Sequence, residues 1–236
     1  MLVRGDDVNI LQCNYGTYFA IIGDIIDSKK IQDRLLVQQN MNAILDKISK
    51  KYEQNISSKF MITLGDEFQG LLNNGKYIIE IINTIEDEMH PIELRFGIGV
   101  GSITTPINHD LPIGADGPAY YNARKMIETQ KKNKKKRMEV RTNISLAIED
   151  NLQLSDLLNA IFSLTTLIKT SWTSRQREII NAYIGCDGNQ NNTASMLDVN
   201  QSTIRKVLKA SGFYEYRQAN QMITNTLIGL TEGCDD

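Results

Sequence analysis

Two acidic residues stand where predicted β-strands end. Asp24 follows the apolar run 19–23, and Asp66 follows Gly65 within the largely apolar stretch 61–72. A Gly-Asp pair between apolar and β-branched residues predicts a tight hairpin. Carboxylate oxygens are the ligands that Mg²⁺ and Mn²⁺ prefer, and these ions usually share their coordination shell with substrate phosphates. Asp24 and Asp66 are therefore candidate metal ligands, and the alternative interpretation is an ordinary solvated turn.

Strands and helices alternate in the part of the chain that must position these carboxylates. This alternation, with a hairpin in it, predicts an α/β N-terminal domain over residues 1–150, with a mixed sheet and flanking helices. The predicted strands are 18–23, the two arms of the hairpin, 92–103 and 137–142, and the predicted helices are 32–53, 77–89, 118–132 and 144–150.

The rest of the chain shows helical patterns only. A Leu/Ile-rich helix over 152–169 is expected to form a link, residues 151–170, to an all-α domain over 171–236. The last helix is amphipathic, and its apolar residues Met222, Ile223 and Leu227 are expected to pack on a partner subunit. The helices predicted before it begin at Trp172 and cover 192–197 and 201–211.

Composition and charge exclude several classes of protein. The 236 residues carry a formal net charge of −2, so any binding to nucleic acid needs a local basic patch. Three scattered cysteines favour a reducing, cytoplasmic setting over a disulfide framework, and two histidines do not suggest a histidine-built zinc site. No apolar run has the length of about 18 residues that a membrane span requires. The basic run 131–137 is interpreted as a solvated loop or, alternatively, as a phosphate-binding patch.

The order of three motifs resembles the catalytic domain of class III nucleotide cyclases and the related GGDEF cyclases. The motifs are Asp24-Ile25 at the end of the first strand, Gly65-Asp66 in the hairpin, and the strand Arg95-Phe96-Gly97-Ile98-Gly99-Val100-Gly101. Gly65-Asp66-Glu67-Phe68 also matches the last four letters of GGDEF, although Leu64 replaces its first glycine. Together with its C-terminal helices, the chain is similar to the SatD family, which pairs a cyclase-like domain with a helix-turn-helix.

This resemblance implies a set of site residues. Asp24, Asp66 and the backbone carbonyl of Ile25 would hold Mg²⁺ or Mn²⁺, which would bind a nucleoside triphosphate. The turn after the first strand would lie at the phosphates. The residues implied in nucleotide binding are Ile26, Asp27, Ser28, Lys29, Arg95, Tyr121, Asn122 and Lys125.

The chain departs from the cyclase pattern in the helix that would stabilise the transition state. The family has Asn and, four residues later, Arg, whereas Tyr121 and Lys125 stand at these positions here. Lysine lacks the bidentate fork of arginine, and Asn122 and Arg124 are two residues apart and so lie on different faces of the helix. If the domain were active, Asp24, Asp66 and Lys125 would be its catalytic residues.

The C-terminal pattern resembles the helix-turn-helix of sigma-factor region four and of LuxR-type regulators. Thr173-Ser174-Arg175-Gln176-Arg177-Glu178 opens the first helix, and Ala194 in the second allows a close helix crossing. The N-terminal part of the third helix would meet base edges in the major groove. The alternative is a helical bundle for protein contacts. The residues expected to bind DNA are Gln201, Ser202, Thr203, Arg205, Lys206 and Lys209.

Two hypotheses follow from these patterns. In the first, the protein is a cytoplasmic, homodimeric transcriptional regulator that binds duplex DNA, and its degenerate cyclase-like domain binds a nucleotide or metal or drives dimerisation. In the second, the same domain is a metal-dependent nucleotidyl cyclase that acts on a nucleoside triphosphate, and the C-terminal helices localise or regulate it.

Overall fold

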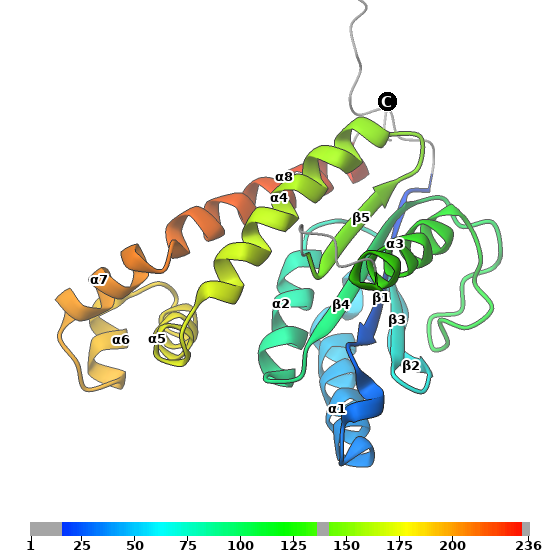
Figure 1. The fold of residues 1–236 in the computed structure, drawn as a ribbon. Helices are drawn as coiled ribbons and strands as arrows, with labels where there is room; N and C mark the ends of the chain where they lie inside the picture. The colour runs from blue at the N-terminus through cyan, green and yellow to red at the C-terminus, as the bar shows by residue number, and fades with distance from the viewer. Residues whose placement is uncertain (1–15, 136–141, 233–236) are drawn as a thin grey trace, which may run out of the picture.

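A five-stranded mixed sheet forms the centre of the structure (Figure 1). The computed structural model describes residues 16–135 and 142–232, except for the side chains of 134, 135 and 232. The strand order is β2-β3-β1-β4-β5, in which only the β4–β5 pair is parallel. The predicted mixed sheet with flanking helices is therefore confirmed. The strands are β1 (Tyr18–Ile25), β2 (Ile56–Leu64), β3 (Glu67–Leu72), β4 (Leu94–Gly101) and β5 (Ile144–Ile148).

Helices cover both faces of this sheet. The main core lies between one sheet face and α1, α2, α4 and α8, and among the helices of the described residues only α3 packs on the other face. The 3-10 turns η1 (Ser28–Lys30) and η2 (Glu53–Asn55) flank α1. The helices are α1 (Arg34–Lys51), α2 (Ile78–Met89), α3 (Pro118–Lys135), α4 (Leu152–Ser171), α5 (Ser174–Gly185), α6 (Gln190–Met196), α7 (Gln201–Ala210) and α8 (Phe213–Glu232).

Side chains of β1 alternate between the two cores. Phe19 and Ile21 belong to the main core, whereas Ala20 and Ile22 pack under α3. This period of two places the next residue of the second set, Asp24, on the α3 face as well. The strand thus delivers a carboxylate to the end of an otherwise apolar layer.

Glycines of β4 allow α3 to approach the sheet closely. A Cβ on Gly99 would lie 1.9 Å from the Ala119 carbonyl oxygen, and one on Gly97 would lie 2.2 Å from that of Ala123. The backbone of α3 therefore rests directly on β4, and this contact sets the position of every side chain along the helix.

The segment 144–150 is not the helix that the sequence pattern predicts. Residues Ile144–Ile148 form β5, which pairs in parallel with β4 from Phe96 to Val100. Side chains from both faces of this short strand are buried, and pairing with β4 overrides the weak helical pattern. The strand predicted over 137–142 lies almost wholly outside the described residues.

Three short helices, α5 to α7, surround an aromatic cluster separate from the main core. Trp172, Tyr183, Phe213 and Tyr216 are buried in this cluster with Ile204 and Leu208. Thr173 and Gln176 form a capping box at the start of α5. Ala194 is buried, as expected from its small side chain.

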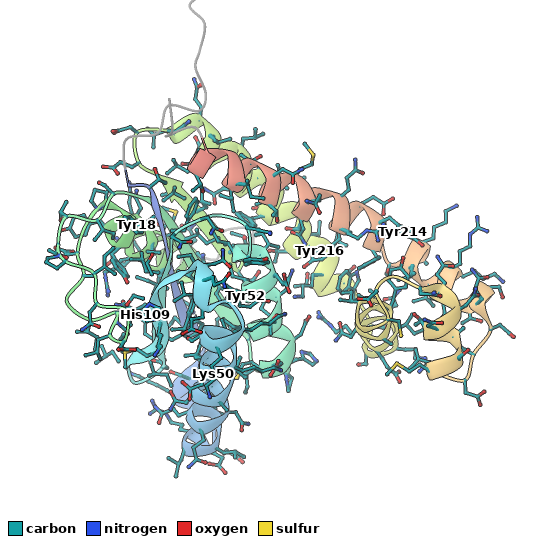
Figure 2. All side chains as sticks on the ribbon, turned by 180° about the vertical axis from the view of Figure 1, so that it is seen from behind. Tyr18, Lys50, Tyr52, His109, Tyr214 and Tyr216 are labelled. Atoms are coloured by element: carbon teal, nitrogen blue, oxygen red, sulfur yellow. The ribbon has the colours of Figure 1, made fainter. Side chains whose placement is uncertain are left out.

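The last helix joins the aromatic cluster to the main core. Tyr216, near its start, lies in the cluster (Figure 2), whereas Ile223 and Leu227 are fully buried in the main core. The prediction that these two residues pack on a partner subunit is therefore wrong, and only Met222 of that set is exposed. Gly75 allows this packing, because a Cβ there would lie 2.4 Å from the backbone of Leu227.

A buried polar network stands where α4 and α8 meet α2. Lys169 forms ion pairs with Glu86 at 2.8 Å and Asp87 at 3.4 Å and donates to Asn83, which also accepts from Tyr216. Burial alone would lower the pKa of Lys169, but Glu86, Tyr216 and Asp87 raise it above its ordinary value. The lysine therefore stays charged and ties α4 and α8 to α2.

The contact between α3 and β4 predicts a large cost for a methyl group at Gly99. Gly99→Ala should lower the free energy of unfolding by about 1–3 kcal/mol, because α3 must move off the sheet. Gly185→Ala is the control, since its Cβ would meet no atom within 4 Å. It should leave stability unchanged or raise it by up to about 1 kcal/mol. Urea denaturation measures both, and equal midpoints would contradict the close contact.

Removal of the buried Lys169 side chain is expected to lower the stability of the protein strongly. Lys169→Met should destabilise the protein by about 3–5 kcal/mol, because it leaves Glu86 charged and buried without its partner. The control is Lys51→Met, which breaks an exposed ion pair with Glu80 and should cost less than about 1 kcal/mol. Thermal and urea unfolding of the two variants test this difference. A Lys169 variant as stable as the Lys51 variant would refute the structural role of the network.

Candidate functional site

The end of β1 and the β2–β3 turn meet at one corner of the sheet. The Ile25 amide donates to the Asp66 carbonyl at 3.3 Å, and the Ile26 amide donates to the Glu93 carbonyl at 2.8 Å. Gly65 adopts a positive φ of 62° in the turn, as its place in the predicted hairpin requires. These backbone contacts bring Asp24 and Asp66, which are 42 positions apart in the chain, to the same corner.

Asp24 is buried between two cations. Its Oδ2 lies 3.3 Å from Arg95 Nε and 3.3 Å from Lys131 Nζ. Register explains the first contact, because Arg95 is directly opposite Asp24 in the β1–β4 pair. Burial raises the pKa of the Asp24 carboxyl, Lys131 and Arg95 oppose this rise, and Asp66 adds to it. The pKa of Asp24 is raised on balance, and its charge is largely compensated within the chain.

A divalent metal is the group that the sequence pattern implies at this corner. Asp24, Asp66 and the Ile25 carbonyl offer the oxygen ligands that Mg²⁺ or Mn²⁺ requires. However, Arg95 and Lys131 already contact Asp24. Within residues 16–135 and 142–232, no group of three or more His, Cys, Asp or Glu side chains could hold a metal. The donor set therefore does not fit a divalent metal unless Lys131 leaves Asp24.

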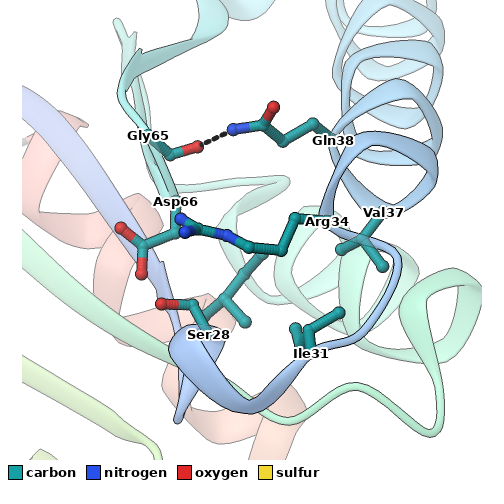
Figure 3. Close-up of a pocket in the computed structure, with 8 residues that line it drawn as sticks. Ser28, Ile31, Arg34, Val37, Gln38, Gly65 and Asp66 are labelled. Atoms are coloured by element: carbon teal, nitrogen blue, oxygen red, sulfur yellow. Dashed lines mark hydrogen bonds between the residues drawn. The ribbon is translucent and has the colours of Figure 1, made fainter.

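A small pocket lies beside this corner, between the start of α1 and the hairpin (Figure 3). Gln38 closes one side by donating to the Gly65 carbonyl at 2.5 Å. The Arg34 side chain extends from α1 towards Asp66, and Ser28 lies below them. A guanidinium, a hydroxyl and a carboxylate thus lie around one opening of about 10 Å³, which has room for about one water molecule.

Only part of the predicted phosphate loop lines this pocket. Ser28 and Ile25 line it, whereas Ile26, Asp27 and Lys29 are not among its lining residues. Asp27 adopts a positive φ of 56° and pairs with Lys30. Arg34 was not predicted from the sequence, and the signal that could have identified it is its place as the first residue of α1.

The residues predicted on α3 are spread along the helix. Tyr121 donates to Asp116 at 2.5 Å, Asn122 donates to the Val100 carbonyl at 3.2 Å, and Lys125 is exposed. Val100 is near the end of β4 opposite to Arg95. Within one chain, the structure therefore does not bring Tyr121 and Asn122 to Asp24.

Two other basic residues of α3 reach the acidic corner instead. Arg124 lies 3.3 Å from Glu67, and Lys131 lies 3.3 Å from Asp24. The sequence analysis assigned Lys131 to a solvated loop or a phosphate patch, but residues up to Lys135 are part of α3. The remainder of the basic run, 136–137, lies outside the described residues.

One face of α7 is exposed and free of acidic residues. Gln201, Ser202, Arg205, Lys206 and Lys209 are exposed, and Thr203 is half-buried. Ile204 and Leu208 are fully buried on the opposite side, in the aromatic cluster. No Asp or Glu occurs between Asp198 and Glu215, so this face is locally basic although the chain is not. The six residues predicted to bind DNA thus lie on one short helix at the outer end of the molecule (Figure 1).

Among the described residues, no helix is long and apolar enough to cross a membrane.

Comparisons with known proteins identify the family. No curated protein matches the chain. Solved structures that resemble it include a bacterial light-regulated adenylyl cyclase, with 14% identity, a TM-score of 0.41, and coverage of 55% of this chain and 74% of the other. The guanylate cyclase domain of RhGC from Catenaria anguillulae in complex with GTP has 17% identity, a TM-score of 0.36, and coverage of 49% and 74%. A regulator of polyketide synthase expression from Bifidobacterium adolescentis has 13% identity, a TM-score of 0.29, and coverage of 93% and 82%.

All three TM-scores are below 0.5, and the fold is defined by the strand order and pairing of the sheet. The model of the SatD family matches residues 18–228, which is most of the chain and includes both the sheet and the C-terminal helices. The chain therefore belongs to the SatD family.

Proposed function

We propose that this protein is a regulator that binds duplex DNA through α5, α6 and α7 and binds a nucleotide in its α/β part. The observation that carries the proposal is the division of α7 into a buried apolar side and an exposed side of amides, hydroxyls and cations. Amides and hydroxyls suit base edges, whereas Arg and Lys suit phosphates and guanine.

The geometry of α6 and α7 suits a helix-turn-helix. The connection between them is four residues long, 197–200, and the Val199 amide donates to the Ala194 carbonyl at 3.0 Å. Asp198 takes a positive φ of 51° in this turn. A short turn of this kind sets two helices at a large angle and leaves the second free to enter the major groove.

Protein contact is the alternative use of these helices, and the exposed residues argue against it. An interface of that kind has an apolar centre. The large apolar residues that are exposed on the three helices, Ile184 and Met196, lie on α5 and α6, whereas the exposed face of α7 is polar and basic. We therefore assign base contacts to Gln201, Ser202 and Thr203, and phosphate or guanine contacts to Arg205, Lys206 and Lys209.

The surface around the small pocket beside Asp66 is the proposed site for the nucleotide phosphates, because the pocket itself holds no more than about one water molecule. Arg34, Ser28 and Lys29 would bind the phosphates, and Ile26 and Asp27 would shape the loop that carries them. Because Arg95 and Lys131 compensate Asp24, such binding needs no divalent metal at that carboxylate. A structural change caused by nucleotide binding there would be transmitted to the DNA-binding helices through α4 and α8. These two helices run from the sheet to α5–α7 (Figure 1).

A metal-dependent nucleotidyl cyclase is the second candidate. The backbone contact between Ile25 and Asp66, which places two carboxylates at one corner, favours it. It requires that Lys131 leave Asp24 and that Lys125 act where the cyclase pattern has arginine. For this candidate Asp24, Asp66 and Lys125 are the proposed catalytic residues, with Mg²⁺ or Mn²⁺ on Asp24, Asp66 and the Ile25 carbonyl.

Arg205 provides the direct test of DNA binding. Arg205→Ala should weaken binding to the preferred duplex by about 1–3 kcal/mol and relax the preference at one base pair, if the guanidinium contacts guanine. The control is Arg175→Ala, which removes another exposed arginine, one that pairs with Glu178 on α5. Selection from a random-sequence duplex library, followed by fluorescence anisotropy, measures both effects.

A folding control completes this experiment. Ile204→Ala should destabilise the α5–α7 helices by about 2–5 kcal/mol, because Ile204 is fully buried in their cluster. An Arg205→Ala protein that is folded and has unaltered affinity for every selected duplex would show that α7 is not a recognition helix.

Arg34 provides the test of the nucleotide site. Arg34→Ala should weaken nucleoside triphosphate binding about 10- to 100-fold, the effect of removing one charge-assisted hydrogen bond. Binding should be nearly the same with and without Mn²⁺, and Arg175→Ala should leave it unchanged. Calorimetry measures the affinities, and chromatography of the nucleotides detects turnover. Cyclic or linear products that appear with Mn²⁺ and vanish in Asp66→Asn would establish the second candidate instead.

A further inference from the structure

The outer side of α4 is apolar and exposed. Leu157, Leu164 and Leu167 are 59%, 62% and 66% exposed. The inner side of the same helix is buried against the sheet and α8 through Leu154, Leu158 and Phe162. A helix that is apolar on both sides is typical of one that is covered on both sides. The outer side of α4 therefore needs a partner that the described part of the chain does not provide.

The spacing of these residues is that of a helix-pairing seam. Leu157, Ala160, Leu164 and Leu167 are separated by three, four and three positions. These intervals are the a and d positions of a heptad, which form the contact line between two paired helices. We call Leu157, Ala160, Leu164 and Leu167 the α4 seam.

The charge of the seam indicates what covers it. None of its residues ionises, and of the charged residues in α4, Asp156 and Lys169, the lysine is already paired with Glu86. The α4 seam has no charge that could form an ion pair with a charged partner. Its apolar surface complements the same apolar surface on another copy of the chain. Two-fold pairing of identical surfaces is the commonest way in which proteins form homo-oligomers.

We infer that two copies of this chain pair through their α4 seams, with the helices antiparallel. Antiparallel packing sets the opposite ends of the two helix dipoles beside each other, which is favourable. The seam is centred near position 162, so residue 160 of one copy would lie opposite Leu164 of the other. The two-fold axis would pass between the helices at this point.

This arrangement also sets the distance between the two DNA-binding parts, a point that rests on the proposed function. About ten residues separate the centre of the seam from Trp172, where α4 ends, and these span about 15 Å of helix. The two sets of α5–α7 would therefore begin about 30 Å apart. Half-sites in one turn of DNA are about 34–36 Å apart, so the antiparallel pair separates the two sets by a distance of this order, whereas a parallel pair would place both sets side by side.

Light scattering of the full chain tests the pairing without DNA. Wild-type protein at micromolar concentration should have the mass of two chains, and Leu164→Glu or Leu167→Glu should have the mass of one with an unchanged circular dichroism spectrum. The control is Leu35→Glu, an equally exposed leucine on α1, which should remain a dimer. A wild-type monomer would overturn the inference and leave the seam to a different partner. A dimer that survives both α4 substitutions would overturn it as well.

Disulfide trapping tests the direction of the helices. Single cysteines are placed at Ala160 or at Leu164 in a chain whose three native cysteines are changed to serine. An antiparallel pair should cross-link the Ala160→Cys chain to the Leu164→Cys chain in a mixture. A parallel pair would instead cross-link each variant to itself, and that result would refute the antiparallel arrangement. Because neither experiment uses DNA, loss of DNA binding in Arg205→Ala and loss of the dimer in Leu164→Glu are separate outcomes.

Discussion

The close contact between α3 and β4 is the constraint on which the candidate site depends. Gly97 and Gly99 leave no side chain between the helix backbone and the strand, so the position of α3 along the sheet is set within narrow limits. Because α3 lies on β4 in this register, Lys131 reaches Asp24 and Arg124 reaches Glu67. The electrostatic character of the acidic corner therefore follows from a packing contact several residues away.

Arg95 and Lys131 balance the negative charge of Asp24, so this corner differs from a simple pair of metal-binding carboxylates. A buried carboxylate without a partner would be costly, and the two cations reduce that cost. Since Arg95 is itself buried, it is held in place, whereas Lys131 is about two-fifths exposed and is free to exchange partners with less penalty. An added ligand could therefore contact Asp24 only where Lys131 moves away from this carboxylate.

The link between the α/β part and the C-terminal helices is built from two helices. Helix α4 leads out from the sheet and α8 returns to it, and the Lys169 network joins both to α2. Trp172, at the end of α4, donates to the Ser211 carbonyl and lies 5.0 Å from the Tyr216 ring. Movement of α5–α7 would have to break these contacts together, because they share residues at the same junction. A change in the position of α5–α7 would therefore require a shift of the whole helix pair.

Local patterns in the sequence determined much of this structure. An apolar run predicted β1, alternation of apolar residues predicted β4, and the Gly65-Asp66 pair predicted the hairpin. Helical spacing predicted α1 and α2, and a Leu/Ile-rich stretch predicted α4. The position of Asp24 at the end of an apolar strand followed from the same patterns, as did a helix over 201–211 where the structure has α7. Periods of two and of 3.6 residues report which face of an element is apolar, and this information is present in any short stretch of chain.

Only the tertiary structure decided what covers each apolar face and which charges meet. Residues 144–148 became a strand because β4 offered an edge to pair with, and Ile223 and Leu227 entered the main core because α8 turns back onto the sheet. The ion pair between Asp24 and Lys131 joins residues 107 positions apart, and it exists because two glycines of β4 let α3 settle on the strand. A sequence pattern indicates that an apolar face or a charged side chain needs a partner. Which partner it finds is set by strand order and helix position, and these depend on contacts throughout the chain.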